Sequence, residues 1–149
     1  MTKNNDGVIF LDVDGVLVPW DRFDPSCMQN LVCIQKCTGA AIVITSTWRL
    51  YPHQKTLLEA AMTEYGLEPA GYTPNLRDSG MSRAEEILDW LDRHPQTSRK
   101  VILDDDNLGR GGSVLADCHL RTDRLRGLTG EVVERAIAIL TCDQTGTAK

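Results

Sequence analysis

Short apolar segments alternate along this chain with longer segments whose apolar residues recur at helical spacing. The apolar segments cover residues 7–11, 40–44 and 100–103, and a weaker one covers 119–122. Uninterrupted apolar runs of this length, rich in β-branched residues, are typical of strands buried on both faces of a sheet. We therefore predict four strands.

Helical periodicity fills the intervals between these strands. Asp24 followed by Pro25 is a typical helix start, because the carboxylate caps free N–H groups and proline has no N–H to leave unsatisfied. Gly39 is placed to end that helix. A second helix, ended by Gly66, carries its apolar face on Leu57, Leu58, Ala61, Met62 and Tyr65.

Two further helices follow. Ser82 and Glu85 form a capping-box pattern, and the helix that they begin extends to Pro95. The last helix has its apolar residues at Val132, Val133, Ala136, Ile139 and Leu140. Strands that alternate with helices at these lengths predict an α/β fold, a three-layer Rossmann-like architecture with a mostly parallel sheet and helices on both faces.

Length and composition fit this fold. A chain of 149 residues with 42% hydrophobic and 25% charged residues has the size and profile of one folded domain. We expect a single domain over residues 1–149, with a core at about 7–141 and a polar tail at 142–149. The net charge of −5 argues against a surface that binds nucleic acid by general phosphate attraction, although a local basic rim remains compatible with it.

The N-terminal region and the cysteines indicate the compartment. Residues 1–6 are polar, and the apolar segment after them is interrupted by Asp12 and Asp14, which fits neither a signal peptide nor a membrane span. The five cysteines lack the paired short spacings of zinc sites and of disulfide frameworks. We therefore expect a cytoplasmic protein that binds no membrane.

Polar side chains follow three of the predicted strands. Asp12, Thr45 and the pair Asp104-Asp105 each stand directly after an apolar run, and the carboxyl ends of parallel strands are where such sheets bind ligands. Two carboxylates about 4 Å apart repel each other by roughly 4 kcal/mol at an effective dielectric constant of about 20. A divalent cation offsets this repulsion, and oxygen-only ligands favour Mg²⁺, with Ca²⁺ as the alternative.

The order of these residues resembles the haloacid dehalogenase (HAD) superfamily of phosphatases, whose four motifs can be placed across residues 8–106. The first motif is similar to Phe10–Leu17. The resemblance implies that Asp12 is the nucleophile and a metal ligand. It also implies that Asp14 is the general acid and base and binds the metal through its backbone carbonyl.

The second and third motifs imply phosphate contacts. Ile42–Thr45 looks like the second motif, in which the Thr45 hydroxyl and the Ser46 N–H hold the phosphoryl group. The third motif is usually a lysine, and Arg83 takes its place here; the alternative for Arg83 is a solvated arginine in the first helical turn. Gly15 either permits a close turn under the phosphate or is an ordinary loop glycine.

The fourth motif looks like Val101–Asp105. By resemblance, Asp105 contacts the metal directly, and Asp104 supports it or its bound waters. Asp106 is an additional acid that faces solvent. The implied cofactor is therefore Mg²⁺, with ligands at Asp12, Asp14, Asp104 and Asp105.

Three other segments indicate a narrower relationship. Ser46–Arg49, Arg83–Ile87 and Gly127–Thr129 look like the HAD domain of bacterial Swiss Army Knife RNA repair proteins. Within the first segment, Arg49 suits contact with a base or a second phosphate at the entrance. Trp48 either flanks that entrance or packs into the protein.

The resemblance implies a phosphatase that forms an aspartyl-phosphate. The intervals between motifs are too short for a large cap domain, so the pocket is expected to be open and to favour a bulky substrate such as a nucleic-acid end. The alternatives are a phosphoprotein, a small phosphometabolite, or an inactive module that only binds phosphate. No stable partner is evident.

Two further features lie near the end of the chain. Arg121, Arg124 and Arg126 either form a basic rim for such a substrate or are simply solvated. Cys118 and Arg124 have the spacing of cysteine-dependent phosphatases, but Asp123 between them would repel phosphate, which disfavours that mechanism.

Overall fold

The computed structural model describes residues 7–142 and forms one five-stranded sheet. The strands are β1 (Gly7–Leu11), β2 (Ala41–Ile44), β3 (Gly71–Tyr72), β4 (Arg99–Asp104) and β5 (His119–Arg121). They lie in the order β3-β2-β1-β4-β5, and each pairing between them is parallel. The polar N-terminal segment and the tail after residue 142 lie outside the described residues.

Four α-helices connect the strands. They are α1 (Pro25–Thr38), α2 (Pro52–Glu64), α3 (Arg83–Asp92) and α4 (Gly130–Thr141). Three short 3-10 helices follow β2, β3 and β4, at Thr47–Leu50, Arg77–Ser79 and Gly112–Cys118. No helix within residues 7–142 has the length and apolar character needed to cross a bilayer.

The helix ends form as the capping residues predict. Asp24 Oδ1 accepts hydrogen bonds from the N–H groups of Ser26 and Cys27, at 2.7 and 3.1 Å. Both bonds of the Ser82–Glu85 capping box are present. These local bonds explain why the starts of α1 and α3 could be predicted from the sequence.

Two details of the prediction were wrong. Leu57 was assigned to the apolar face of α2, but it is 44% exposed, and the buried residues of that helix are Leu58 and Met62. Strand β3 was not predicted, because two residues of sequence, Gly71 and Tyr72, carry no periodic signal.

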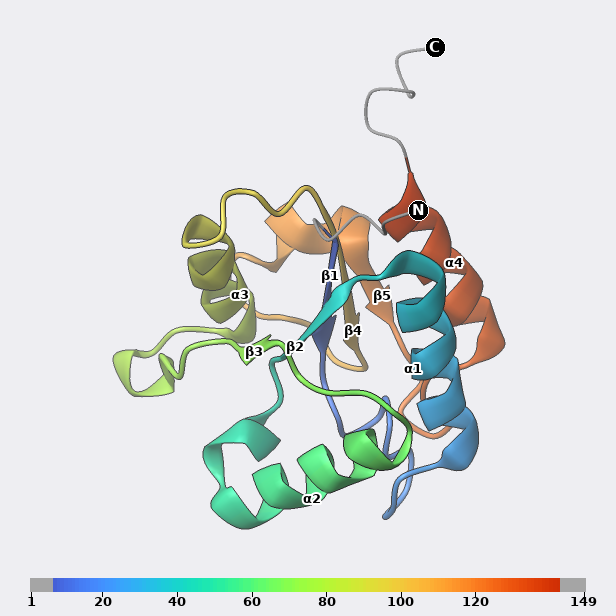
Figure 1. Ribbon diagram of the computed structural model, residues 1–149. Coiled ribbons are helices and arrows are strands. Elements are labelled where there is room, and N and C mark those ends of the chain that lie inside the picture. Colours follow the sequence, from blue (N-terminus) through green and yellow to red (C-terminus); the bar gives the residue numbers. More distant parts are fainter. Residues whose placement is uncertain (1–6, 143–149) are drawn as a thin grey trace.

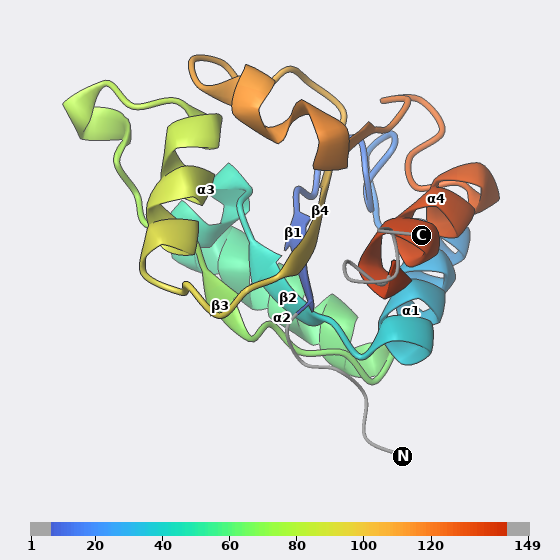
Figure 2. The ribbon, with the colours of Figure 1, turned by 90° about the horizontal axis from the view of Figure 1, so that it is seen from above.

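The sheet lies between two layers of helices (Figures 1 and 2), as the fold class requires. In β1, Ile9 and Leu11 belong to a core cluster with side chains of α1, α2 and α4. Val8 and Phe10 belong to a second cluster with α3 and the 112–118 segment. This alternation places the four residues from Val8 to Leu11 in one core cluster or the other.

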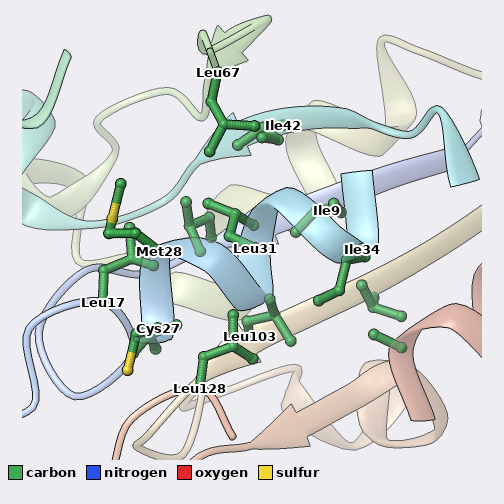
Figure 3. Close-up of a cluster of buried hydrophobic side chains, with 14 of the residues drawn as sticks. Ile9, Leu17, Cys27, Met28, Leu31, Ile34, Ile42, Leu67, Leu103 and Leu128 are labelled. Carbon is green, nitrogen blue, oxygen red and sulfur yellow. The ribbon is translucent and has the colours of Figure 1, made fainter. Parts of the chain in front are cut away.

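Helix α1 supplies much of the first core. Figure 3 shows Met28, Leu31 and Ile34 of this helix gathered with Ile9 and Leu103 of the sheet. Each of these large side chains is fully buried, and such burial contributes about 1.5–3 kcal/mol per residue. The central strands are therefore held firmly between helices.

The strand register brings three strand ends to one level. Leu11 of β1 pairs with Ile44 of β2 and with Leu103 of β4. Hydrogen bonds continue beyond the strands: the Asp12 N–H donates to the Leu103 carbonyl at 3.0 Å, and the Thr45 N–H donates to the Leu11 carbonyl at 2.9 Å. The predicted site residues therefore lie side by side.

Candidate active site

Three carboxylates converge at the carboxyl edge of the sheet. Asp12, Asp104 and Asp105 each offer an oxygen, and these oxygens lie within 4.8 Å of one another. Asp12 and Asp104 are buried and Asp105 is largely so. An oxygen-only donor set of this density fits a hard divalent cation such as Mg²⁺, which these three side chains would hold directly or through bound water. The Asp14 carboxylate is outside this cluster, and its backbone carbonyl as a ligand stays a prediction.

Arg83 lies against the carboxylate cluster. Its Nη1 is 3.1 Å from Asp12 Oδ1 and 2.8 Å from Asp104 Oδ2. The side chain comes from the first turn of α3, where the Ser82–Glu85 capping box fixes the backbone. Arg83 is thus not a solvated arginine; it takes the place predicted from the third motif and bridges two strand ends.

The two neighbouring acids of β4 are placed differently. Asp104 Oδ2 accepts from Arg83, and Asp104 Oδ1 accepts from the Asp106 N–H at 3.0 Å. The Asp105 carboxylate makes a looser ion pair, with Arg124 Nε 3.7 Å from Oδ2. Asp105 therefore has the less constrained carboxylate, which favours it as the direct metal ligand, with Asp104 in the supporting role.

Position 15 requires a glycine, because the Asp105 side chain lies where a Cβ would be. The φ of Gly15 is +78°, and a Cβ added there would lie 2.3 Å from the Asp105 carboxyl carbon. Its carbonyl accepts a hydrogen bond from the buried Thr122 hydroxyl at 2.7 Å. Gly15 is thus not an ordinary loop glycine, and the space that it leaves is occupied by a carboxylate rather than by a phosphate.

Thr45 has an unsatisfied hydroxyl. The residue is fully buried, and Oγ1 has no hydrogen-bond partner within residues 7–142. A buried polar atom without a partner is uncommon and indicates a ligand that completes it. The hydroxyl therefore fits the predicted phosphoryl contact. The Ser46 hydroxyl accepts from the Trp48 N–H at 3.1 Å, and the Ser46 N–H as a phosphate donor stays a prediction.

Arg49 does not bind substrate as predicted. Its side chain is only 3% exposed, and each of its five N–H donors is engaged at 2.8–3.1 Å. The acceptors are the carbonyls of Thr45, Ser46, Thr73 and Pro74 and a carboxylate oxygen of Glu86. No donor remains for a phosphate, so Arg49 instead fixes the loop that carries Thr45.

Glu86, a residue that was not predicted, completes this arrangement. One of its oxygens pairs with Arg49 Nη2 at 3.1 Å, and the other accepts from the Leu76 N–H at 2.9 Å. The pair connects the loop after β2 to α3, and thus Thr45 to Arg83. Both residues lie in the segments that suggested the narrower relationship, but their pairing has no signal in the sequence.

Trp48 joins the site to the core. Its indole Nε1–H donates to Asp14 Oδ2 at 3.1 Å, and its ring packs edge-on against Phe23, with ring centroids 5.5 Å apart. Trp48 thus packs into the protein and also contacts Asp14. Sequence reasoning missed the bond to Asp14, because the residues are 34 positions apart and belong to different loops.

The cluster opens into a cavity of about 410 Å³. Two residues that were not predicted, Arg77 and Met81, line it from the segment that connects β3 to α3. Within the described residues, no domain covers this opening, in agreement with the expected lack of a large cap. The carboxylates are therefore accessible through this cavity.

The three arginines between the end of β5 and α4 differ in their positions. Arg121 and Arg124 each lie 3.7 Å from an acid of the site edge, Asp106 and Asp105 respectively, and both are mostly exposed. Arg126 lines a separate hollow beside α4. Of the three, Arg121 and Arg124 are thus beside acids of the site, Arg121 also lines that hollow, and a role for them as a basic rim stays a prediction.

Cys118 is unsuited to be a nucleophile. It is buried, and burial raises the pKa of its thiol. A catalytic cysteine requires a lowered pKa and access to substrate. The cysteine-dependent mechanism is thus contradicted.

The surroundings of Asp12 raise its pKa to about 7 in the metal-free protein. Burial is the main cause, the Asp104 charge adds to it, and Arg83 opposes it. A cation beside Asp12 would act in the same direction as Arg83 and favour the ionised carboxylate.

This shift predicts how the stability of the metal-free protein depends on pH. The folded state binds the Asp12 proton more tightly than the unfolded state, so the stabilisation is present at low pH and is lost as pH rises from about 4 through about 7. Compared with Asp12→Asn, the wild type in a chelator is expected to lose on the order of 2 kcal/mol of unfolding free energy between about pH 5 and pH 8. Urea titrations check this, and parallel curves for the two proteins would contradict it.

A comparison with known protein families gives a match. Residues 8–133 match the family described as the HAD domain in Swiss Army Knife RNA repair proteins. Neither the curated proteins nor the solved structures give a match. The family match covers all four motif segments and most of the chain, and the fold and the carboxylate cluster agree with it, so the chain belongs to the family of HAD domains in Swiss Army Knife RNA repair proteins.

Proposed function

We propose that this protein is a Mg²⁺-dependent phosphomonoester hydrolase with Asp12 as its nucleophile. The observation that carries the proposal is the convergence of the Asp12, Asp104 and Asp105 carboxylates at the sheet edge, next to the Arg83 guanidinium. The unsatisfied hydroxyl of Thr45 adds a donor at the next strand end. Family membership supports a phosphohydrolase-type activity.

The roles of the side chains follow from their chemistry. An Asp12 oxygen attacks the phosphorus, and the ester P–O bond breaks as the new bond forms, which gives an aspartyl-phosphate. Arg83 and the Thr45 hydroxyl stabilise the phosphoryl oxygens by charge and hydrogen bonding. A bound Mg²⁺ would supply further neutralisation of the phosphoryl charge.

Asp14 is proposed to carry the protons. It gives one to the leaving oxygen in the first step, and in the second step it takes one from the water that hydrolyses the aspartyl-phosphate. Its exposed position beside the cavity is compatible with contact with both leaving group and water.

The substrate class that we propose is an accessible phosphomonoester at a nucleic-acid end. The open cavity admits a bulky chain, and Arg77, Arg121 and Arg124 place positive charge around the acidic centre. The RNA repair context of the family points the same way. A phosphopeptide, a small phosphometabolite and mere phosphate binding are the alternatives.

A panel of substrates tests this proposal. With Mg²⁺, phosphate release is expected from oligonucleotides that carry a 3′- or 5′-phosphate, with kcat/KM at least about tenfold above that for phosphopeptides, nucleotides and cyclic-ended oligonucleotides. Chelation of the metal is expected to stop the reaction. Preference for phosphopeptides would overturn the substrate class, and the absence of metal-dependent turnover would overturn the proposed activity.

A further inference from the structure

The proposed general acid is held by a side chain from another motif. Within residues 7–142, the side-chain hydrogen bond to the Asp14 carboxylate is that from the Trp48 indole, at 3.1 Å. Asp14 is otherwise exposed, so its carboxylate would rotate freely without this bond. A freely rotating acid is a less effective general acid, because proton transfer is fastest when the donor is held in the correct orientation.

Trp48 is itself well restrained. It lies in the Thr47–Leu50 helical turn, where its N–H donates to the Ser46 hydroxyl. Its ring packs edge-on against Phe23, which belongs to the same loop as Asp14. The backbone of Trp48 is therefore held by Ser46, and its ring is held by Phe23.

We infer that Trp48 is a positioning residue for Asp14 in the hydrolysis of phosphomonoesters with basic leaving groups. This inference rests on the proposed function. An indole N–H donates and cannot accept, so its bond engages Asp14 Oδ2 and leaves Oδ1 as the oxygen that gives and takes the proton. In the first step that proton passes to the ester oxygen as the P–O bond breaks, and in the second step Oδ1 regains a proton from the attacking water.

The arrangement also couples two parts of the site. Thr45, the proposed phosphoryl donor, and Trp48 belong to the same loop after β2, and Arg49 fixes that loop through the carbonyls of Thr45 and Ser46. The same rigid loop therefore positions both the bound phosphoryl group, through Thr45, and the acid that protonates the leaving group, through Trp48. A phosphoryl group bound at Thr45 would meet Asp14 in a fixed orientation.

A series of aryl phosphates tests the inference. Nitrophenolate leaves without much help, whereas phenolate is more basic and depends on the acid. In Trp48→Phe, which keeps an aromatic ring but lacks the N–H, kcat is expected to fall about tenfold for phenyl phosphate and no more than about twofold for p-nitrophenyl phosphate, with KM unchanged. Equal losses for both substrates would overturn the inference.

Trp90→Phe is the matched control. Trp90 also packs edge-on against a phenylalanine, Phe10, at 5.4 Å, but it lies in the core cluster on the other face of the sheet. This variant is expected to retain both activities. A double-variant comparison adds a second criterion: in an Asp14→Ala background, Trp48→Phe is expected to cause no further loss for phenyl phosphate, and a further loss would overturn the inference.

A spectroscopic measurement separates this inference from the proposed function. Asp14→Ala is expected to shift the indole N–H resonance of Trp48 in the ¹⁵N–¹H spectrum while leaving those of Trp20 and Trp90 in place. An unshifted resonance would overturn the inference whatever the activity. Turnover that persists in Asp12→Asn would instead overturn the proposed nucleophile, and with it the reaction on which the inference rests.

Discussion

Asp12→Asn is expected to lower kcat for phosphate release by about 10⁴-fold, because an amide oxygen cannot replace the carboxylate as nucleophile. The substitution preserves the shape of the side chain and one oxygen near Arg83. It also removes one of the charges that repel each other in the cluster, so the variant is expected to fold. Steady-state kinetics with Mg²⁺, together with mass spectrometry of the acid-quenched enzyme for a phosphoryl adduct, check the prediction.

Asp106→Asn is the matched control for this experiment. It removes an acid that follows β4 at the same edge of the sheet, but the Asp106 side chain is 75% exposed, and none of its oxygens belongs to the carboxylate cluster. We expect kcat within about twofold of the wild type. Equal rates in Asp12→Asn and the wild type would remove Asp12 from the mechanism.

Arg49→Met is expected to lower the free energy of unfolding by about 3–5 kcal/mol, because it leaves the Glu86 carboxylate buried without its partner. Both side chains are only 3% exposed. The substitution also removes the donors of four backbone carbonyls in the loops after β2 and β3. A loss of this size is a large part of the 5–15 kcal/mol that is typical of a domain.

Arg93→Met is the control for the loss of an arginine ion pair. Arg93 pairs with Asp89 at 3.0 Å on the surface of α3, with 69% of its side chain exposed, and such pairs contribute about 0–1 kcal/mol. Guanidinium chloride titrations of both variants measure the difference. Similar small losses in Arg49→Met and Arg93→Met would contradict the structural role of Arg49.

The strands and helix ends were accessible to sequence reasoning because their causes are local. An apolar run such as residues 7–11 requires burial on both faces, and the caps Asp24 and Ser82 bond to N–H groups two or three residues away. Strand β3 had no such signal, since its two residues are defined only by their pairing with β2. Its position follows from the packed sheet rather than from its own composition.

The site was accessible in part. The acids and Thr45 follow apolar runs, and the rule that parallel strands place such residues at one edge brings them together. The roles of Arg49 and Gly15 were misjudged for a common reason. A guanidinium in the sequence does not show whether its donors are already engaged, and a glycine does not show which atom occupies the space beside it.

The sequence by itself determined the α/β alternation, the capped helix starts and the set of residues at the strand ends. The tertiary structure alone decided that Arg83 bridges Asp12 and Asp104, that Arg49 is buried against Glu86, and that Trp48 holds Asp14. The physical reason is the range of the interactions. Periodicity and capping act within a few residues, whereas these contacts join residues 21 to 71 positions apart in sequence, whose distance is set by strand register and helix packing.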